Sequence, residues 1–303
     1  MTVEADARVR PLAPARTGRA TGSSPRGGMT RPLWWVVCSL VLVLFLYPLW
    51  AMITQALKNP TEAVASPATL VPHSLSFANF RSLAGGSSGL SVVRAAENSL
   101  LVATGATAAT VVLAVLAGYA FAKLRFPGSN IVFFVSLATF MIPFQAIITP
   151  LFLVLQHLHL QNTLVGLGAV YTTFQLPFGI FLMRNSFASV PSSLEEAARI
   201  DGCGTLTAMW RVSIPVAVPG IVTTVLLTFF SSWNEFFAAL ILITDQSKYT
   251  LPISLSILSS GQFGTINWGV LQAGVAVTII PCVAIYLILQ RYYVAGLLAG
   301  AVK

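Results

Sequence analysis

The chain has 303 residues, of which 56% are hydrophobic and 9% are charged, and its mean hydropathy is +0.81. Soluble domains carry about 25% charged residues, so this composition excludes a soluble globular protein and indicates an integral membrane protein. Three widely separated cysteines and three histidines show no disulfide or metal-ligand spacing. We therefore expect no metal and no cofactor bound by this chain.

Six apolar runs follow a polar N-terminal tail. Residues 1–31 are rich in Arg, Pro, Gly, Ser and Thr without helical periodicity, which predicts a disordered tail, and we expect no signal peptide. Each later run approaches or exceeds the roughly 20 residues that cross a hydrocarbon core. We therefore predict an all-α, polytopic membrane protein with six transmembrane helices, at about 33–55, 99–122, 131–155, 164–183, 216–242 and 268–290.

The positions of Lys and Arg predict which side of the membrane each loop faces. With a cytoplasmic N-terminus, 13 of the 17 basic residues fall on the inner side, and Lys58, Arg81, Arg94 and Lys248 fall on the outer side. This bias predicts that both termini and the loop at 184–219 are cytoplasmic. It also explains the net charge of +8, so we expect a lipid bilayer as partner and no nucleic acid.

Small residues and prolines within the apolar runs predict closely packed, bent helices. Ala114, Gly118 and Ala122 recur at the four-residue spacing that lets two helix backbones approach. Prolines inside runs remove a backbone hydrogen bond and bend the helix. Such helices suit a moving translocation path, but static membrane bundles contain them as well. The prolines in question are Pro48, Pro143, Pro150, Pro177 and Pro281.

Glu235 is the one ionisable residue that falls inside a predicted span. A charge at the centre of a spanning helix costs about 2.5–3.5 kcal/mol on insertion scales. Glu235 therefore either faces a cavity or a partner, or lies near the external interface, where water solvates it.

A polar segment at 191–220 interrupts the spans and predicts a short helix. Ser193 and Glu196 have the spacing of a capping box, and Glu195 and Arg199 are spaced to pair across one turn. A helix of about two turns is marginal alone in water. It therefore needs a docking surface, unless it is an amphipathic helix that lies on the lipid.

The end of this short helix is also predicted. Gly202 is placed to end it in a left-handed conformation. Ala197 and Ala198 would give it a low-profile face, and Asp201 would add a polar anchor. A second short helix is expected at 206–210, before prolines open the fifth span.

Several segments resemble the permeases of ATP-binding cassette importers. The segments that resemble the EAA loop of that family are Glu196-Ala197-Ala198, Asp201-Gly202, Ile214-Pro215 and Pro219-Gly220. The resemblance extends over roughly 32–303, as a transmembrane permease domain, and favours the carbohydrate-uptake branch and its maltose-type second permease. The supporting segments are Asn98-Ser99, Arg125-Phe126-Pro127-Gly128, Met141-Ile142-Pro143, Trp233-Asn234-Glu235 and 296–303.

The resemblance implies roles for particular residues. In this family the EAA loop forms a coupling helix, which seats in a groove on a cytoplasmic ATPase, and the C-terminal residues lie against the ATPase as well. The implied coupling residues are Glu196, Ala197, Ala198, Asp201 and Gly202, and the implied tail residues are Gly300, Ala301, Val302 and Lys303.

The resemblance also implies an assembly. It would contain a second homologous permease, two copies of the ATPase that bind ATP and Mg²⁺, and an extracytoplasmic sugar-binding protein. This chain would be a non-catalytic, multi-pass subunit of the cell membrane that forms half of a sugar pathway. A di- or oligosaccharide is favoured, and a non-sugar solute such as glycerol phosphate is the alternative.

Two other classes of protein are weaker interpretations. An ion-coupled secondary transporter would place coupling carboxylates near the midplane, where only Glu235 is available. A membrane-embedded enzyme would need a catalytic constellation or a recognisable motif, and the sequence contains none. Candidate polar groups of a substrate pathway are Gln145, Asn234 and Glu235.

Overall fold

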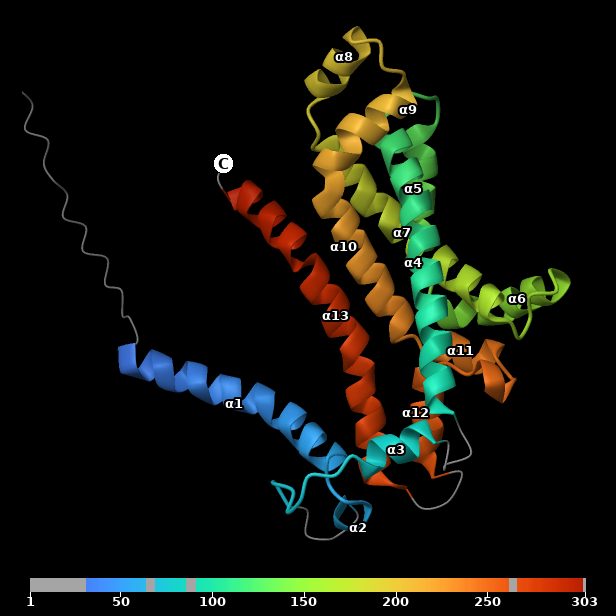
Figure 1. Cartoon of the computed structure of the whole chain (residues 1–303). Helices are drawn as coiled ribbons and strands as arrows, with labels where there is room; N and C mark the ends of the chain where they lie inside the picture. Colours follow the sequence, from blue (N-terminus) through green and yellow to red (C-terminus); the bar gives the residue numbers. More distant parts are fainter. Residues whose placement is uncertain (1–30, 64–68, 86–90, 262–265, 302–303) are drawn as a thin grey trace, which may run out of the picture. The chain divides into compact units, whose positions relative to one another are not determined.

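The structure, a computed structural model, describes residues 31–63, 69–85, 91–261 and 266–301. Regular structure in these ranges is helical throughout, as predicted. The predicted tail at 1–31 lies outside the described residues except for Arg31, which begins the first helix. The helices, labelled in Figure 1, are α1 (Arg31–Ala56), α2 (Pro60–Ala63), α3 (Ala78–Ala84), α4 (Val92–Lys123), α5 (Ser129–Thr139), α6 (Phe144–His157), α7 (Leu164–Ala188), α8 (Ser192–Ile200), α9 (Thr205–Ala208), α10 (Ile214–Trp233), α11 (Phe237–Leu242), α12 (Leu251–Ser260) and α13 (Trp268–Ala301).

The chain divides into two units, residues 1–47 and residues 48–303. The described part of the first unit is the apolar beginning of α1. In the second unit, α8 and α9 lie at one end of the long helices, and α2, α3 and α12 lie at the other end (Figure 1). The two polar regions of this unit are thus separated by the length of its spanning helices.

Five described helical segments are long and apolar enough to cross a membrane, and α5 with α6 makes a sixth if the pair is one crossing. The predicted single helix at 131–155 is wrong, because α5 and α6 meet at 101°. Pro143, directly before α6, has no backbone N–H and cannot continue the preceding helix.

The predicted fifth span at 216–242 is wrong at both ends. A continuous helical segment runs over Thr205–Trp233, through a π-helical turn at Met209–Ser213. The expected separate helix at 206–210 is therefore the beginning of this segment. Its end at Trp233 places Glu235 between α10 and α11 rather than inside a helix.

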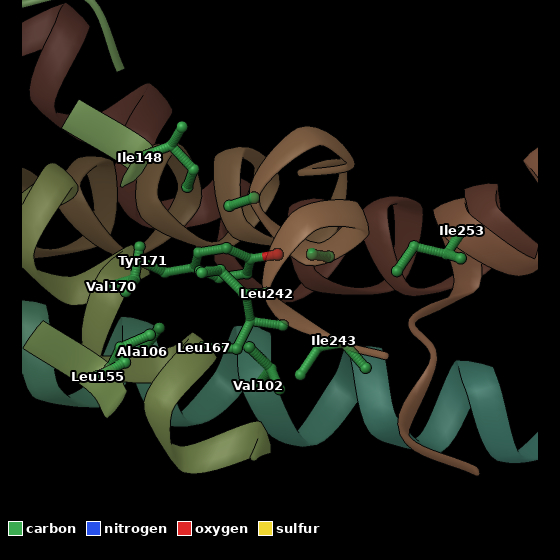
Figure 2. Packing of buried hydrophobic residues seen from close by; sticks show 12 residues of the cluster. Val102, Ala106, Ile148, Leu155, Leu167, Val170, Tyr171, Leu242, Ile243 and Ile253 are labelled. Carbon is green, nitrogen blue, oxygen red and sulfur yellow. The ribbon is translucent and has the colours of Figure 1, made fainter. Parts of the chain in front are cut away.

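Helices α4 and α7 form the most extensive contact of the described chain. Val102 and Ala106 of α4 pack against Leu167, Val170 and Tyr171 of α7 (Figure 2). Towards the α8 end, the packing continues through a second cluster that includes Ala114, Val115 and Tyr119 of α4, and Met183 and Phe187 of α7.

Gly118, from the predicted small-residue stripe, lies at a close approach of α4 to α7. A Cβ atom there would lie 2.5 Å from Met183 Cβ and 2.8 Å from the Arg184 backbone nitrogen. By contrast, a Cβ on Gly105 of the same helix would meet nothing within 4 Å. Packing against α7 therefore requires a glycine at position 118, whereas position 105 has room for a side chain.

We expect Gly118→Val to destabilise the fold, because a backbone atom of α7 cannot move aside as a side chain can. Overpacking typically costs about 1–3 kcal/mol, and this site should lie at the upper end. Gly105→Ala is the matched control and should be neutral. Thermal stability of the detergent-purified chain checks both, and equal melting temperatures for the two variants would contradict this packing.

Candidate functional site

The start of α8 differs from the predicted capping box. An N-cap at Ser193 would make Leu194 the first helical residue. The helix instead begins two residues earlier, at Ser192. Pro191 is the N-cap, and no side chain caps the helix. The box is therefore wrong, although the short helix after Pro191 is confirmed.

The end of α8 confirms the prediction for Gly202, which has a φ of +83°. Its N–H donates to the Arg199 carbonyl at 3.0 Å, and the Cys203 N–H donates to the Ala198 carbonyl at 2.9 Å. These two bonds form the Schellman arrangement that ends helices at a left-handed residue. The chain therefore reverses sharply at Gly202, towards α9.

Glu195 anchors α8 to the spanning helices instead of pairing with Arg199. Its side chain is buried, accepts a hydrogen bond from the Ser213 hydroxyl, and lies 3.8 Å from Lys123 Nζ. Lys123, at the end of α4, also donates to the Val190 carbonyl at 2.7 Å. The predicted Glu195–Arg199 pair is wrong, because the fold brings a better partner to Glu195.

The opposite face of α8 is exposed. Of the five predicted coupling residues, Glu196, Ala197, Asp201 and Gly202 are exposed, whereas Ala198 is buried against the chain. Large apolar side chains lie beside them, and Ile200 is 87% exposed. These apolar residues were not predicted as part of the site, although the sequence shows them within an otherwise polar segment. We call the exposed set the coupling surface: Leu194, Glu196, Ala197, Ile200, Asp201, Gly202 and Leu206.

The three candidate pathway residues lie in different places. Gln145 is exposed on α6, and Asn234 is exposed at the end of α10, where its Nδ2 donates to the Phe230 carbonyl at 2.8 Å. Neither lines the pocket described next. Glu235 does line it.

Glu235 accepts three hydrogen bonds. It accepts from the Tyr171 hydroxyl at 2.8 Å and from the backbone N–H groups of Ala238 at 2.8 Å and Ala239 at 3.2 Å. The carboxylate thereby caps the first turn of α11 and ties it to α7. Tyr171 belongs to the packed cluster in Figure 2, where its hydroxyl oxygen is drawn in red.

A pocket of about 440 Å³ opens beside Glu235. Its walls come from the α5–α6 bend, from α7, and from the end of α10 with the start of α11. Aromatic and apolar side chains predominate. The polar side chains of its lining are Tyr171, Gln175, Ser231 and Glu235.

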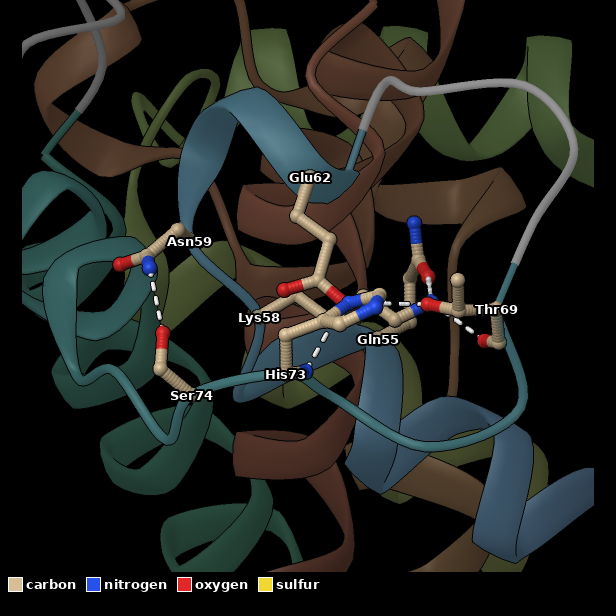
Figure 3. A network of polar contacts seen from close by, with 7 residues as sticks. All are labelled: Gln55, Lys58, Asn59, Glu62, Thr69, His73 and Ser74. Atoms are coloured by element: carbon tan, nitrogen blue, oxygen red, sulfur yellow. Dashed lines mark hydrogen bonds and ion pairs between the residues drawn. The ribbon is translucent and has the colours of Figure 1, made fainter.

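A polar network joins described residues between α1 and α3 (Figure 3). Lys58 is buried and donates to Gln55 Oε1 at 2.8 Å and to the Thr69 carbonyl at 2.6 Å. Glu62 accepts from the Thr69 hydroxyl at 3.0 Å and from His73 Nδ1 at 2.9 Å. The hydrogen bond from His73 lowers the pKa of Glu62 below its ordinary value.

Helix α8 is fixed to two spanning helices through Glu195, and its other face exposes apolar and acidic side chains. Such an element is suited to a membrane transport subunit that a partner moves from outside the bilayer. Residues 110–298 match the family described as binding-protein-dependent transport system inner membrane components. The chain belongs to this family.

Relatives with assigned names agree with this membership. The chain is 35% identical over 278 residues to the trehalose transport system permease protein of Mycobacterium tuberculosis, covering 91% of this chain and 99% of that protein. It is 33% identical to the sulfoquinovosyl glycerol transport system permease protein of Agrobacterium fabrum, covering 90% and 94%. It is 31% identical to the diacetylchitobiose uptake system permease protein of Streptomyces coelicolor, covering 86% and 85%.

Solved structures show the same fold. A chain from a bacterial ABC transporter involved in importing the acidic polysaccharide alginate superposes with a TM-score of 0.74 at 24% identity, covering 89% of this chain and all of that one. A chain of the MetNI methionine ABC transporter, in inward-facing conformations, gives 0.52 at 18% identity, covering 73% and 99%.

Membership settles the class of protein. The chain is the permease component of an ATP-binding cassette importer, a multi-pass protein of the cell membrane, and it is not an enzyme, because a partner ATPase hydrolyses the ATP. An ATPase and a binding protein are implied as partners. The ion-coupled transporter and the membrane-embedded enzyme are thereby excluded.

Proposed function

We propose that this chain forms half of the translocation pathway for a sugar, of di- or oligosaccharide size, beside a second homologous permease. Three of the relatives with assigned names are permeases for trehalose, sulfoquinovosyl glycerol and diacetylchitobiose, which supports a sugar-derived substrate. Glycerol phosphate, the non-sugar alternative, has no comparable support among them. The excess of basic residues on one side supports cytoplasmic N- and C-termini.

Coupling to the ATPase is proposed to occur through the coupling surface. The observation that carries this is the clamp on Glu195: one face of α8 is fixed to Lys123 and Ser213, so its other face must be available to a partner. If the ATPase displaced Ile200 or Leu206, the movement would be transmitted to α4 and to α10 through the contacts of Glu195. Two copies of the ATPase, which bind ATP and Mg²⁺, would serve the two permeases.

The individual coupling residues then take distinct roles. Glu196, Ala197, Asp201 and Gly202 would contact the ATPase, whereas Ala198, which is buried, would hold α8 against the permease. The C-terminal contact of Gly300, Ala301, Val302 and Lys303 rests on family resemblance. Gly300 and Ala301 end α13, and Val302 and Lys303 lie outside the described residues.

Purification of the tagged chain from its native membrane in mild detergent tests this assembly. We expect an ATPase with a phosphate-binding loop, a second permease with an EAA loop, and import of a labelled sugar after reconstitution with the binding protein. Recovery of the chain alone or as a homodimer, from membranes in which other complexes stay intact, would contradict the proposal.

A further inference from the structure

The geometry points to a carbohydrate subsite on this chain itself: the pocket beside Glu235 would receive an uncharged sugar as it crosses the membrane. This inference rests on the proposed function and deepens it. It assigns part of the substrate contact to this subunit, through Tyr171, Gln175, Ser231 and Glu235.

The pocket lies where a bent pair of helices, α5 and α6, meets the end of the spanning segment that contains α10. The α5–α6 bend and the break between α10 and α11 both contribute to its lining, with α7 between them. Non-helical backbone at membrane depth is tolerated only where protein buries it or where it lines a water-filled cavity. Non-helical backbone from the α5–α6 bend and from the α10–α11 connection lines one pocket, which favours a water-filled cavity. Its volume of about 440 Å³ is within the ~300–1,000 Å³ of small-molecule sites.

The polar side chains of the pocket have unused hydrogen-bonding capacity. The Gln175 amide and the Ser231 hydroxyl, both pocket-lining, make no hydrogen bond within the described chain. Glu235 already accepts three hydrogen bonds, and a carboxylate has about four acceptor sites. Together they offer donors and acceptors that sugar hydroxyls can satisfy.

Aromatic rings supply the apolar wall that the C–H faces of a sugar ring require. Phe144 and Phe174 both line the pocket and pack edge to face, with their ring centres 4.3 Å apart. Small-molecule sites typically combine such walls with a few fixed polar groups. The orientation of the Phe144 ring is further held by Phe237 of α11, whose ring centre is 6.0 Å away.

The charge of the pocket favours a neutral ligand. None of the described residues that line it is a Lys or an Arg, whereas Glu235 contributes a carboxylate. A phosphate or carboxylate ligand would be repelled by the Glu235 carboxylate, with no cation in the lining to compensate. Such repulsion is one way in which a site rejects the wrong ligand. An uncharged polyhydroxyl compound incurs no such penalty.

The test uses the complete importer in proteoliposomes with its binding protein, and a panel of labelled neutral di- and oligosaccharides that includes trehalose and diacetylchitobiose. The readout is sugar imported per ATP hydrolysed. We expect Gln175→Ala and Ser231→Ala each to lower this ratio about five- to tenfold, since one lost hydrogen bond is worth roughly 1 kcal/mol. A purely structural defect would lower import and hydrolysis together. Gln156→Ala, an exposed glutamine on α6 outside the pocket, is the matched control.

Different failures have different meanings. If the wild-type importer moves a sugar and both variants keep its ratio, the subsite is wrong and the proposed function stands. If the wild-type importer moves no member of the panel, the proposed function fails and the subsite fails with it. Import of a uronic-acid disaccharide as fast as its neutral counterpart would overturn the assignment to an uncharged sugar.

Discussion

Glu195→Ala is expected to reduce both the stability of the permease and its transport activity. The substitution leaves the Lys123 side chain, which is 9% exposed, without its carboxylate and leaves the buried Ser213 hydroxyl without this acceptor. Breaking one side of a buried ion pair typically costs about 3–5 kcal/mol, so the melting temperature in detergent should fall clearly. Uptake should fall more than tenfold, because α8 would no longer be fixed to α4 and α10.

Two comparison variants separate the clamp from the coupling surface. Glu196→Ala changes the neighbouring exposed glutamate and should leave the melting temperature unchanged while weakening coupling. The double variant Lys123→Met with Glu195→Leu replaces the pair by apolar groups and should recover most of the stability. Equal melting temperatures for Glu195→Ala and Glu196→Ala would contradict the clamp.

Gly202→Asp is expected to insert normally in the membrane and to abolish uptake. Its φ of +83° costs a residue with a Cβ about 1–2 kcal/mol, which strains the end of α8. A Cβ at this position would meet nothing within 4 Å in the chain, so the new side chain and its charge would extend into the coupling surface. The measurement is sugar uptake normalised to the amount of permease in the membrane.

Gly204 provides the control for this glycine. It lies two residues further on, has an ordinary φ of −70°, and likewise has open space around its Cβ position. Gly204→Ala should therefore retain uptake close to the wild-type value. Normal uptake by Gly202→Asp would show that this turn does not couple the permease to its ATPase.

Features that depend on neighbouring residues could be predicted from the sequence. The apolar runs located the spanning segments, because the hydrocarbon core imposes a length and a composition on each one. The short polar helix and its end at Gly202 also followed from local rules. The C-terminal boundary of α8 is accordingly confirmed.

Features that depend on distant contacts could not be predicted. Tyr171 and Glu235 are 64 residues apart in the chain, and no local pattern marks them as partners. Lys123 and Glu195 meet only because α4 and α7 pack side by side. The 101° bend was signalled by Pro143, but hydropathy alone does not distinguish a bent pair from a continuous helix.

Site-specific photocrosslinking from Ile200 tests the central claim most directly. A photoreactive amino acid at Ile200, on the coupling surface, should yield an adduct with the ATPase in the intact assembly. The same amino acid at Leu75, which is 73% exposed in the segment between α2 and α3, should yield none. An intact assembly that gives no ATPase adduct from Ile200, or one that gives it from Leu75, would contradict the account.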